Sequence, residues 1–249
     1  VLHQASLTSV QDSIKKPKLY YNQNVNAFVK LLKTLKKFKI KKLIYASSCA
    51  VYGEVNKTNY EKDILNKNKM NSPYSKSKKI IEEYSSKIKT TFPKIGLRYF
   101  NVYGPHQKTN GFNLPVISSW MKQILNDNRI IIYGNGDSYR NYIYVDDVVN
   151  ANISSAFYLK KDKILNICSK EKITLKKLNT ILMQVIKLLK IKYNKLPLYK
   201  QLRSGDIKSS HGSNYLARKK IKFKESQNLS KCLIKTFRWQ IRYNKKSFI

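Results

Sequence analysis

The first third of the chain alternates between two hydrophobic periods. From about Pro17 to Phe38, apolar residues recur every three or four positions, which predicts an amphipathic helix. Leu43–Ala46 is a short, uninterrupted apolar run of the kind found in buried strands, and it ends at Ser47 and Ser48. The residues that follow, 54–71, are rich in lysine and asparagine, which indicates a loop.

A second helix and strand follow that loop. Ser72 is a good N-cap residue and Pro73 is favoured at the first helical position, so a helix is expected from Ser72 to about Thr91. Ile95–Tyr99 is the next expected strand. Strands that alternate with helices of this length are typical of an α/β fold with a doubly wound parallel sheet. Ligands bind at the carboxyl ends of such strands, where Ser48 and Asn101 lie.

Beyond Pro105 the pattern changes. Helices are expected over 113–126, 145–159, 174–189 and 227–240, with short strands at 130–133 and 164–168 and a loop from Leu196 to Ser210. No Gly-, Ser- or Pro-rich spacer separates the two halves. We therefore expect the second half to form a smaller region that is interleaved with the first.

Composition excludes several classes of protein. The 249 residues are 42% apolar and carry a net charge of +36, but the lysines are spread over the whole length. No nucleic-acid-binding motif accompanies them, so we expect no specific nucleic-acid partner. No apolar run is long enough to span a membrane. Three scattered cysteines argue against a disulfide framework and fit a reducing cytoplasm. The three histidines have no metal-ligand spacing, so no metal site is expected.

The candidate chemistry lies in the predicted helix that begins at Ser72. Tyr74 and Lys78 are four residues apart and therefore share a helix face. A free tyrosine titrates near ~10, and a neighbouring ammonium is expected to lower that pKa so that the phenol can act as a base. Ser48 is placed to donate to a substrate oxygen or to relay its proton.

These residues fall within a series of motifs that resembles the extended short-chain dehydrogenase/reductases, in particular the NAD-dependent nucleotide-sugar 4-epimerases. The resemblance runs from Val1 to about Ile241. The motifs that carry it, in the order of the family, are Val1-Leu2-His3-Gln4-Ala5-Ser6, Asn24-Val25-Asn26, Tyr45-Ala46-Ser47-Ser48-Cys49-Ala50-Val51-Tyr52-Gly53, Tyr74-x-x-x-Lys78, Arg98-Tyr99-Phe100-Asn101, Tyr133-Gly134-Asn135-Gly136, Arg140-Asn141-Tyr142-Ile143-Tyr144-Val145-Asp146-Asp147 and Arg203-Ser204-Gly205-Asp206.

The resemblance implies a Rossmann-like fold, NAD as the cofactor and a UDP-sugar as the substrate. It implies a catalytic group formed by Ser48, Tyr74 and Lys78, with Tyr74 as the base for the sugar 4-hydroxyl. The implied cofactor contacts come from Gln4, Ala5, Ser6, Asn24, Tyr74, Lys78 and Tyr99. The implied substrate contacts come from Ser9, Ser48, Asn101, Arg140, Arg203, Asp206 and Ser210.

The resemblance also implies a domain division. Residues 1–105 correspond to the C-terminal part of an NAD-binding Rossmann domain, with 130–147 partly interleaved, and 106–249 correspond mainly to the substrate-binding region. The family's glycine-rich turn does not occur, because all eight glycines lie at Gly53 or later. We therefore expect an N-terminally truncated Rossmann domain and hold open that the chain is an inactive fragment. Family members commonly dimerise through helices that correspond to about 17–38 and 72–91, so a homodimer is expected for a full-length protein.

Two departures from related enzymes bear on the reaction. The family's 4,6-dehydratases and decarboxylases place acidic residues where this chain has Cys49 and Ala50, so the resemblance favours epimerisation. Ser210 stands where glucose-restricted epimerases carry a tyrosine, which leaves room for a 2-acetamido group. The expected substrate is UDP-GlcNAc/UDP-GalNAc or the uronic acid form, for surface polysaccharide synthesis. UDP-glucose and UDP-glucuronate 4-epimerase remain as alternatives.

Overall fold

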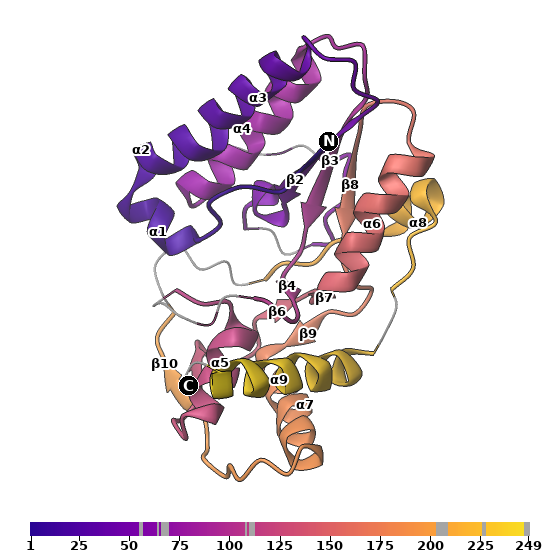
Figure 1. The fold of residues 1–249 in the computed structure, drawn as a ribbon. Helices are drawn as coiled ribbons and strands as arrows, with labels where there is room; N and C mark the ends of the chain where they lie inside the picture. The colour runs from indigo at the N-terminus through magenta and orange to yellow at the C-terminus, as the bar shows by residue number, and fades with distance from the viewer. Residues whose placement is uncertain are drawn as a thin grey trace.

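The computed structural model describes residues 1–54, 57–63, 65, 70–107, 109, 113–202, 209–225 and 228–246. Four parallel strands form the central sheet in the order β1-β2-β3-β8 (Figure 1). They are β1 (Leu2–His3), β2 (Leu43–Ser48), β3 (Lys94–Tyr99) and β8 (Lys163–Ile167). β2 and β3 are buried almost throughout because helices cover both faces. The expected parallel, doubly wound α/β sheet is confirmed.

One face of the sheet is covered by the helices that precede β2 and β3. They are α1 (Val10–Lys15), α2 (Pro17–Tyr20), a π-helical segment (Tyr21–Asn26), α3 (Ala27–Leu35) and α4 (Pro73–Lys87). Phe28 and Leu32 of α3 pack with Tyr45 of β2 and Ile81 of α4 in one apolar cluster. The helix expected to reach Phe38 ends at Leu35, and Phe38 is exposed.

The start of α4 follows the expected capping. The side chain of Ser72 accepts a hydrogen bond from the backbone N–H of Ser75 at 3.2 Å, and Pro73 occupies the first turn. The helix ends at Lys87, earlier than the expected Thr91, because Ile88 adopts an extended backbone.

α6 (Val145–Tyr158) and α8 (Tyr215–Ile221) cover the opposite face of the sheet (Figure 1). Ala151 of α6 and Ala217 of α8 are fully buried against Ile95 and Leu165 of the strands. The sequence pattern did not predict α8. It is only seven residues long and four of those residues are lysine, arginine or tyrosine, so it has little periodic signal.

The smaller region lies beyond the carboxyl ends of the strands, at the lower part of Figure 1. Its helices are α5 (Val116–Leu125), α7 (Leu175–Leu188) and α9 (Leu229–Lys246). Three strand pairs complete it: β5 (Ile131–Tyr133) with β10 (Leu198–Lys200), β4 (Val102–Tyr103) with β7 (Ile143–Tyr144), and β6 (Tyr139–Arg140) with β9 (Ile173–Thr174). Trp120, Leu182 and Phe237 pack at its core.

Two features differ from the expected second half. Residues Leu198–Lys200 form a strand parallel to β5 instead of the expected loop; all three side chains are exposed, so no alternation marks the strand in the sequence. α6 with β8, and later α8, return to the central sheet, so the chain re-enters the first region twice after Pro105. The functional division at residue 105 stays a prediction. None of the helices in the described residues has the length and apolar character to cross a membrane.

Candidate functional site

The carboxyl ends of the strands open into a cavity of about 570 Å³ between the sheet and the smaller region. Ser48 and Tyr99 end adjacent strands as register partners and both line it. Nine of the residues predicted for the site share this cavity: Gln4, Ser6, Ser48, Tyr74, Lys78, Tyr99, Asn101, Arg140 and Ser210. They come from both regions of the fold, so the cavity depends on how the two regions pack.

Ser48, Tyr74 and Lys78 meet at one wall of the cavity. Ser48 caps the short 3₁₀ turn Cys49–Tyr52, accepting from the N–H of Ala50 at 3.1 Å, and its side chain also hydrogen-bonds the Tyr74 hydroxyl. Lys78 lies one helical turn beyond Tyr74 and donates to the carbonyl oxygen of Ala46 at 2.9 Å. The serine and the phenol are therefore in the contact that a proton relay between them needs.

The expected effect of Lys78 on Tyr74 is wrong for this structure. Burial raises the pKa of Tyr74 to about 12, and the hydrogen bond from Ser48 is the contact that opposes the rise. Burial also lowers the pKa of Lys78 to about 8, against the charge of Glu82. The physical reason is the position of Lys78: the residue is 3% exposed, and its ammonium is held on the β2 backbone. A buried ammonium with this pKa still carries its proton at neutral pH.

A ring of hydrogen bonds joins the ends of β1 and β3 to α6 at the cavity. The Tyr99 hydroxyl donates to Gln4 Oε1 at 2.9 Å, and Gln4 Nε2 donates to Asn152 Oδ1 at 3.0 Å. Asn152 Nδ2 lies 2.9 Å from the Tyr99 hydroxyl and also donates to the carbonyl of Val148. Asn152 was not predicted; its only signal is a polar residue on the buried face of α6.

Asn24 has a different place from the one predicted. Its side chain pairs with both backbone groups of Leu7, accepting from the N–H at 2.9 Å and donating to the carbonyl at 3.0 Å, and it also donates to Ser77 at 3.1 Å. It is buried and does not line the cavity. Asn24 therefore orders the segment around Leu7, whose neighbours Ser6 and Thr8 do line the cavity. Ala5 is exposed and is not part of the wall.

The remaining predicted residues lie toward an adjoining cavity of about 390 Å³. Asn101 and Arg140 line both cavities, and Ser9 lines the second while its hydroxyl caps α1. Asn101 Nδ2 donates to the carbonyl of Asn141 at 3.0 Å, and Arg140 Nη1 donates to the carbonyl of Tyr139 at 2.8 Å. Arg140 forms a β-bridge with Ser210. The two other predicted residues, Arg203 and Asp206, lie outside the described residues.

The charged side chains that the structure describes in the cavity wall are of one sign. Among its described lining residues none is an aspartate or a glutamate, whereas Lys78 and Arg140 supply positive charge. Cys49 and Ala50, directly after Ser48, are part of that wall. Within the described part of the chain, no group of three or more His, Cys, Asp or Glu side chains is placed to hold a metal ion.

Comparison with known proteins identifies the family. Residues 1–168 match the NAD dependent epimerase/dehydratase family. The chain belongs to this family. Curated relatives include a putative UDP-glucose 4-epimerase of Methanocaldococcus jannaschii, 35% identical over an alignment of 175 residues that covers 67% of this chain and 54% of that protein. Another is a dTDP-D-glucose 4,6-dehydratase of Dictyostelium discoideum, 34% identical over 61% of this chain and 36% of that protein.

Solved structures agree with this assignment. The UDP-N-acetylglucosamine 4-epimerase from Methanobrevibacter ruminantium M1, in complex with UDP-N-acetylmuramic acid, superposes with a TM-score of 0.90 at 33% identity, over 98% of this chain and 76% of that one. The UDP-glucose 4-epimerase of Thermotoga maritima, with UDP-glucose, gives 0.89 at 28% identity, over 98% and 77%. The chain nevertheless spans only about a third to a half of the first curated relatives it matches.

The residues present fit the nicotinamide end of the family's cofactor. A ribose needs hydrogen-bonding partners for its hydroxyls, and a nicotinamide needs a flat wall. Lys78 uses one of its three N–H donors on Ala46, which leaves two for a ligand. Tyr74 and Tyr99 place hydroxyl and ring atoms on the same wall, beside Gln4 and Ser6. Of the predicted cofactor residues, this fit supports Gln4, Ser6, Tyr74, Lys78 and Tyr99.

Proposed function

We propose that this protein is an NAD-dependent 4-epimerase of a UDP-sugar. The observation that carries the proposal is the meeting of Ser48, Tyr74 and Lys78 in a cavity whose described lining has no carboxylate. Elimination of water from the sugar, as in the family's dehydratases, needs an acid beside the serine. Cys49 and Ala50 supply none, so the wall favours epimerisation over dehydration.

The roles of the side chains follow from their contacts. Tyr74 takes the proton of the sugar 4-hydroxyl, and Ser48 holds the same oxygen while it is hydrogen-bonded to the phenol. Lys78 holds the ribose of the cofactor with the N–H donors that its hydrogen bond to Ala46 leaves. Gln4, Ser6, Tyr99 and Lys78 would hold NAD, which would supply the reversible hydride acceptor for C4 of the sugar. Arg140 and Asn101, at the junction of the two cavities, are proposed to hold the diphosphate.

We further propose that the sugar carries a 2-acetamido group, as in UDP-GlcNAc and UDP-GalNAc or the corresponding uronic acid, for a surface polysaccharide. Ser210 supports this proposal because it lines the cavity with a small side chain. UDP-glucose and UDP-glucuronate are the competing substrates. The three cysteines are free, which fits the proposed cytoplasmic location.

The direct test is turnover on a substrate panel. The protein encoded by the complete reading frame is incubated with NAD and with UDP-GlcNAc, UDP-glucose or UDP-glucuronate, and the C4 epimers are separated by chromatography. We expect epimerisation, fastest with UDP-GlcNAc. A folded protein that converts none of the three would refute the proposed function, and a preference for UDP-glucose would refute the substrate assignment.

Replacing Ser210, which lines the cavity, gives a sharper test of the substrate class. Ser210→Tyr places a bulky ring at the proposed acetamido position, whereas Ser210→Ala keeps the space. We expect the tyrosine variant to lose at least about tenfold in kcat/KM for UDP-GlcNAc, a difference of ~1.4 kcal/mol in transition-state stabilisation. Its kcat/KM for UDP-glucose should change little, and the alanine variant should resemble the wild type with both.

We also propose that the protein dimerises through α3 and α4. Val29 and Leu31 of α3, with Ile80 and Tyr84 of α4, are only partly buried at the outer edge of their apolar cluster. Other apolar residues of the two helices, among them Phe28, Leu32 and Ile81, are buried within the protomer. Sedimentation equilibrium of the full-length protein at micromolar concentration tests this point, and a strict monomer would remove it.

A further inference from the structure

A row of buried polar side chains crosses the central sheet directly beneath the cavity. Ser47 of β2, Arg98 of β3 and Asn166 of β8 are register partners on three adjacent strands. All three are buried, at 3%, 3% and 0% exposure. The next row along the same strands contains Ser48 and Tyr99, which line the cavity. The polar row is therefore the layer of the sheet that directly supports Ser48 and Tyr99.

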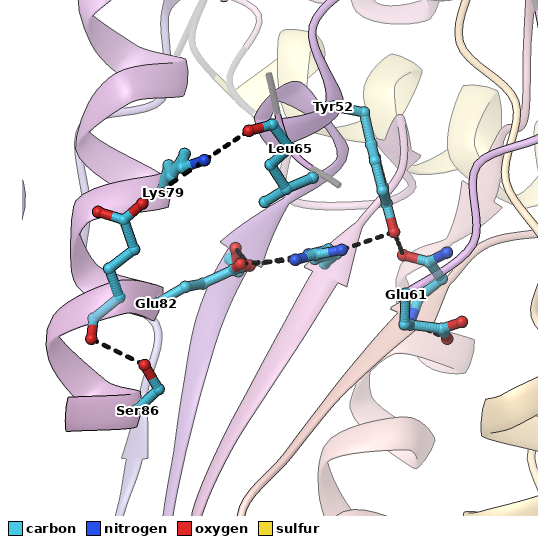
Figure 2. A network of polar contacts seen from close by, with 10 residues as sticks. Tyr52, Glu61, Leu65, Lys79, Glu82 and Ser86 are labelled. Carbon is cyan, nitrogen blue, oxygen red and sulfur yellow. Dashed lines mark hydrogen bonds and ion pairs between the residues drawn. The ribbon is translucent and has the colours of Figure 1, made fainter. Parts of the chain in front are cut away.

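Glu82 of α4 joins this row to the helix that carries Tyr74 and Lys78 (Figure 2). Its carboxylate receives a two-point contact from Arg98, with Nε to Oε1 at 2.9 Å and Nη2 to Oε2 at 2.7 Å. The hydroxyl of Ser47 donates to the same Oε1 at 2.5 Å. Glu82 lies one turn after Lys78 and two turns after Tyr74, so it shares their helix face.

The network continues on the far side of Arg98 (Figure 2). Arg98 Nη1 donates to the Tyr52 hydroxyl at 2.7 Å, and that hydroxyl donates to Asn166 Oδ1 at 2.7 Å. Tyr52 ends the 3₁₀ turn that begins directly after Ser48. The turn that carries the serine is thus held at both ends, by Ser47 on one side and by Tyr52 on the other.

Stability alone does not account for such a group. The side chains of Arg98 and Glu82 are 4% and 5% exposed, and burying two charges costs several kcal/mol per ion that their attraction does not reliably repay. An apolar packing of the same volume is often as stable or more so. A two-point arginine–carboxylate contact does, however, fix distance and orientation between the elements that it joins.

We propose that Glu82 is a positioning residue for the reaction. Through Ser47 and Arg98 it fixes the end of β2, and with it Ser48, relative to the helix face that presents Tyr74 and Lys78. This inference rests on the proposed function for its catalytic meaning. The geometric part, that Glu82 orders the end of β2 and the turn after it, stands independently.

The charge of Glu82 has a second effect, on Lys78. Burial lowers the pKa of Lys78 to about 8, and Glu82 is the neighbouring charge that raises it. The other titratable groups that face the ammonium are Tyr74 on α4 and His3 on β1, whose pKa is lowered by burial and by Lys78. Loss of the carboxylate charge therefore moves the pKa of Lys78 further down, toward neutral pH.

The test compares Glu82→Gln with Glu83→Gln in the protein from the complete reading frame. Glu83 is the next residue on α4, is 40% exposed and pairs with Lys79 at 3.5 Å. For Glu82→Gln we expect kcat to fall about 10- to 100-fold, as for a displaced catalytic group, while KM for the UDP-sugar stays within about threefold. The alkaline limb of the kcat–pH profile should move to lower pH. Glu83→Gln should resemble the wild type in all three.

Hydrogen exchange gives a readout that does not depend on turnover. Amide exchange of the segment 43–53, followed by mass spectrometry, should accelerate in Glu82→Gln and not in Glu83→Gln, while exchange in α7 stays unchanged. If the wild type has no epimerase activity the proposed function fails, but exchange still decides whether Glu82 orders β2.

Two results would overturn the proposal. One is a Glu82→Gln protein with wild-type kcat, pH profile and exchange. The other is uniform acceleration of exchange over the whole chain with kcat and UDP-sugar binding lost together, which would show a general structural role. Should Glu82→Gln not fold, Ser47→Ala serves instead, because it removes one hydroxyl and leaves the Arg98–Glu82 ion pair intact. We expect Ser47→Ala to accelerate exchange in 43–53 and to lower kcat with KM unchanged. Wild-type behaviour of that variant overturns the proposal.

Discussion

Tyr74 is a phenol whose environment works against its ionisation. Burial raises its pKa to about 12, and its contact with Ser48 opposes that rise. The residue therefore holds its proton at rest and can act as a base only while the phenolate is stabilised. We expect Tyr74→Phe to lower kcat by at least ~100-fold, the amount usually supplied by a positioned base, because the ring stays and the acceptor is lost. UDP-sugar affinity, measured by calorimetry, should change little, and near wild-type turnover would assign the base elsewhere.

At Lys78, the buried charge that serves the proposed activity also destabilises the folded protein. Its pKa is lowered from 10.5 to about 8, which corresponds to a destabilisation on the order of 3 kcal/mol below pH 8. The unfolded chain binds the proton more tightly than the folded one, so this group makes the protein more stable as the pH rises from about 8 to the unfolded value of 10.5. Lys78→Met removes the charge and loses a hydrogen bond to Ala46 worth about 1 kcal/mol.

We therefore expect Lys78→Met to be inactive and yet more stable than the wild type at pH 7 by urea unfolding. The difference should shrink between pH 8 and 10, where the wild type loses the buried charge. Lys76→Met, at an exposed position of the same helix, serves as the control and should change neither quantity. A Lys78→Met protein that is less stable at pH 7, with an unchanged pH dependence, would contradict the burial argument.

At the scale of elements, the π-helical segment Tyr21–Asn26 is joined through the side chain of Asn24 both to α4 and to the segment beside the cavity wall. Asn24 satisfies both backbone groups of Leu7 and bonds Ser77 of α4. Asn24→Ala leaves these partners unpaired, and we expect a loss of about 2 kcal/mol in the free energy of unfolding. Exchange at residues 6–8 should also accelerate. Asn26→Ala is the matched control, because Asn26 is exposed and bonds only Asn22 among the contacts described here; an equal loss in both variants would refute the role of Asn24.

The helices and strands show how much of the fold can be predicted from the sequence. Strands β2 and β3 and helix α4 were predicted within a few residues because both the apolar period and the Ser72 cap are local signals. β10 and α8 were missed because their residues are exposed or charged and are held by partners distant in sequence. The same limit applies to the site. Nine predicted residues share the cavity through motif positions, but the dual backbone contact of Asn24 and the network of Glu82 depend on packing that no local pattern encodes.

At the scale of the whole molecule, opposing surface properties determine how the 249-residue chain behaves in solution. Val149, Ile153 and Phe157 form a stripe along one side of α6 and are 49%, 46% and 77% exposed. β1, whose Leu2 is 53% exposed, is one of the two edge strands of the described central sheet. Apolar stripes and open strand edges both promote association. The net charge of +36 opposes it by repulsion.

Because salt screens that repulsion over about 10 Å at 0.1 M and about 3 Å at 1 M, we expect the 249-residue chain to associate increasingly as salt is added. The double variant Ile153→Lys and Phe157→Lys interrupts the stripe and should reduce the association, as measured by sedimentation velocity at several salt concentrations. Leu188→Lys is the control: Leu188 is 69% exposed but stands at the end of α7, away from α6, so its replacement should have no effect beyond one added charge. Equal sedimentation of all three proteins at high salt would show that the α6 stripe does not drive association.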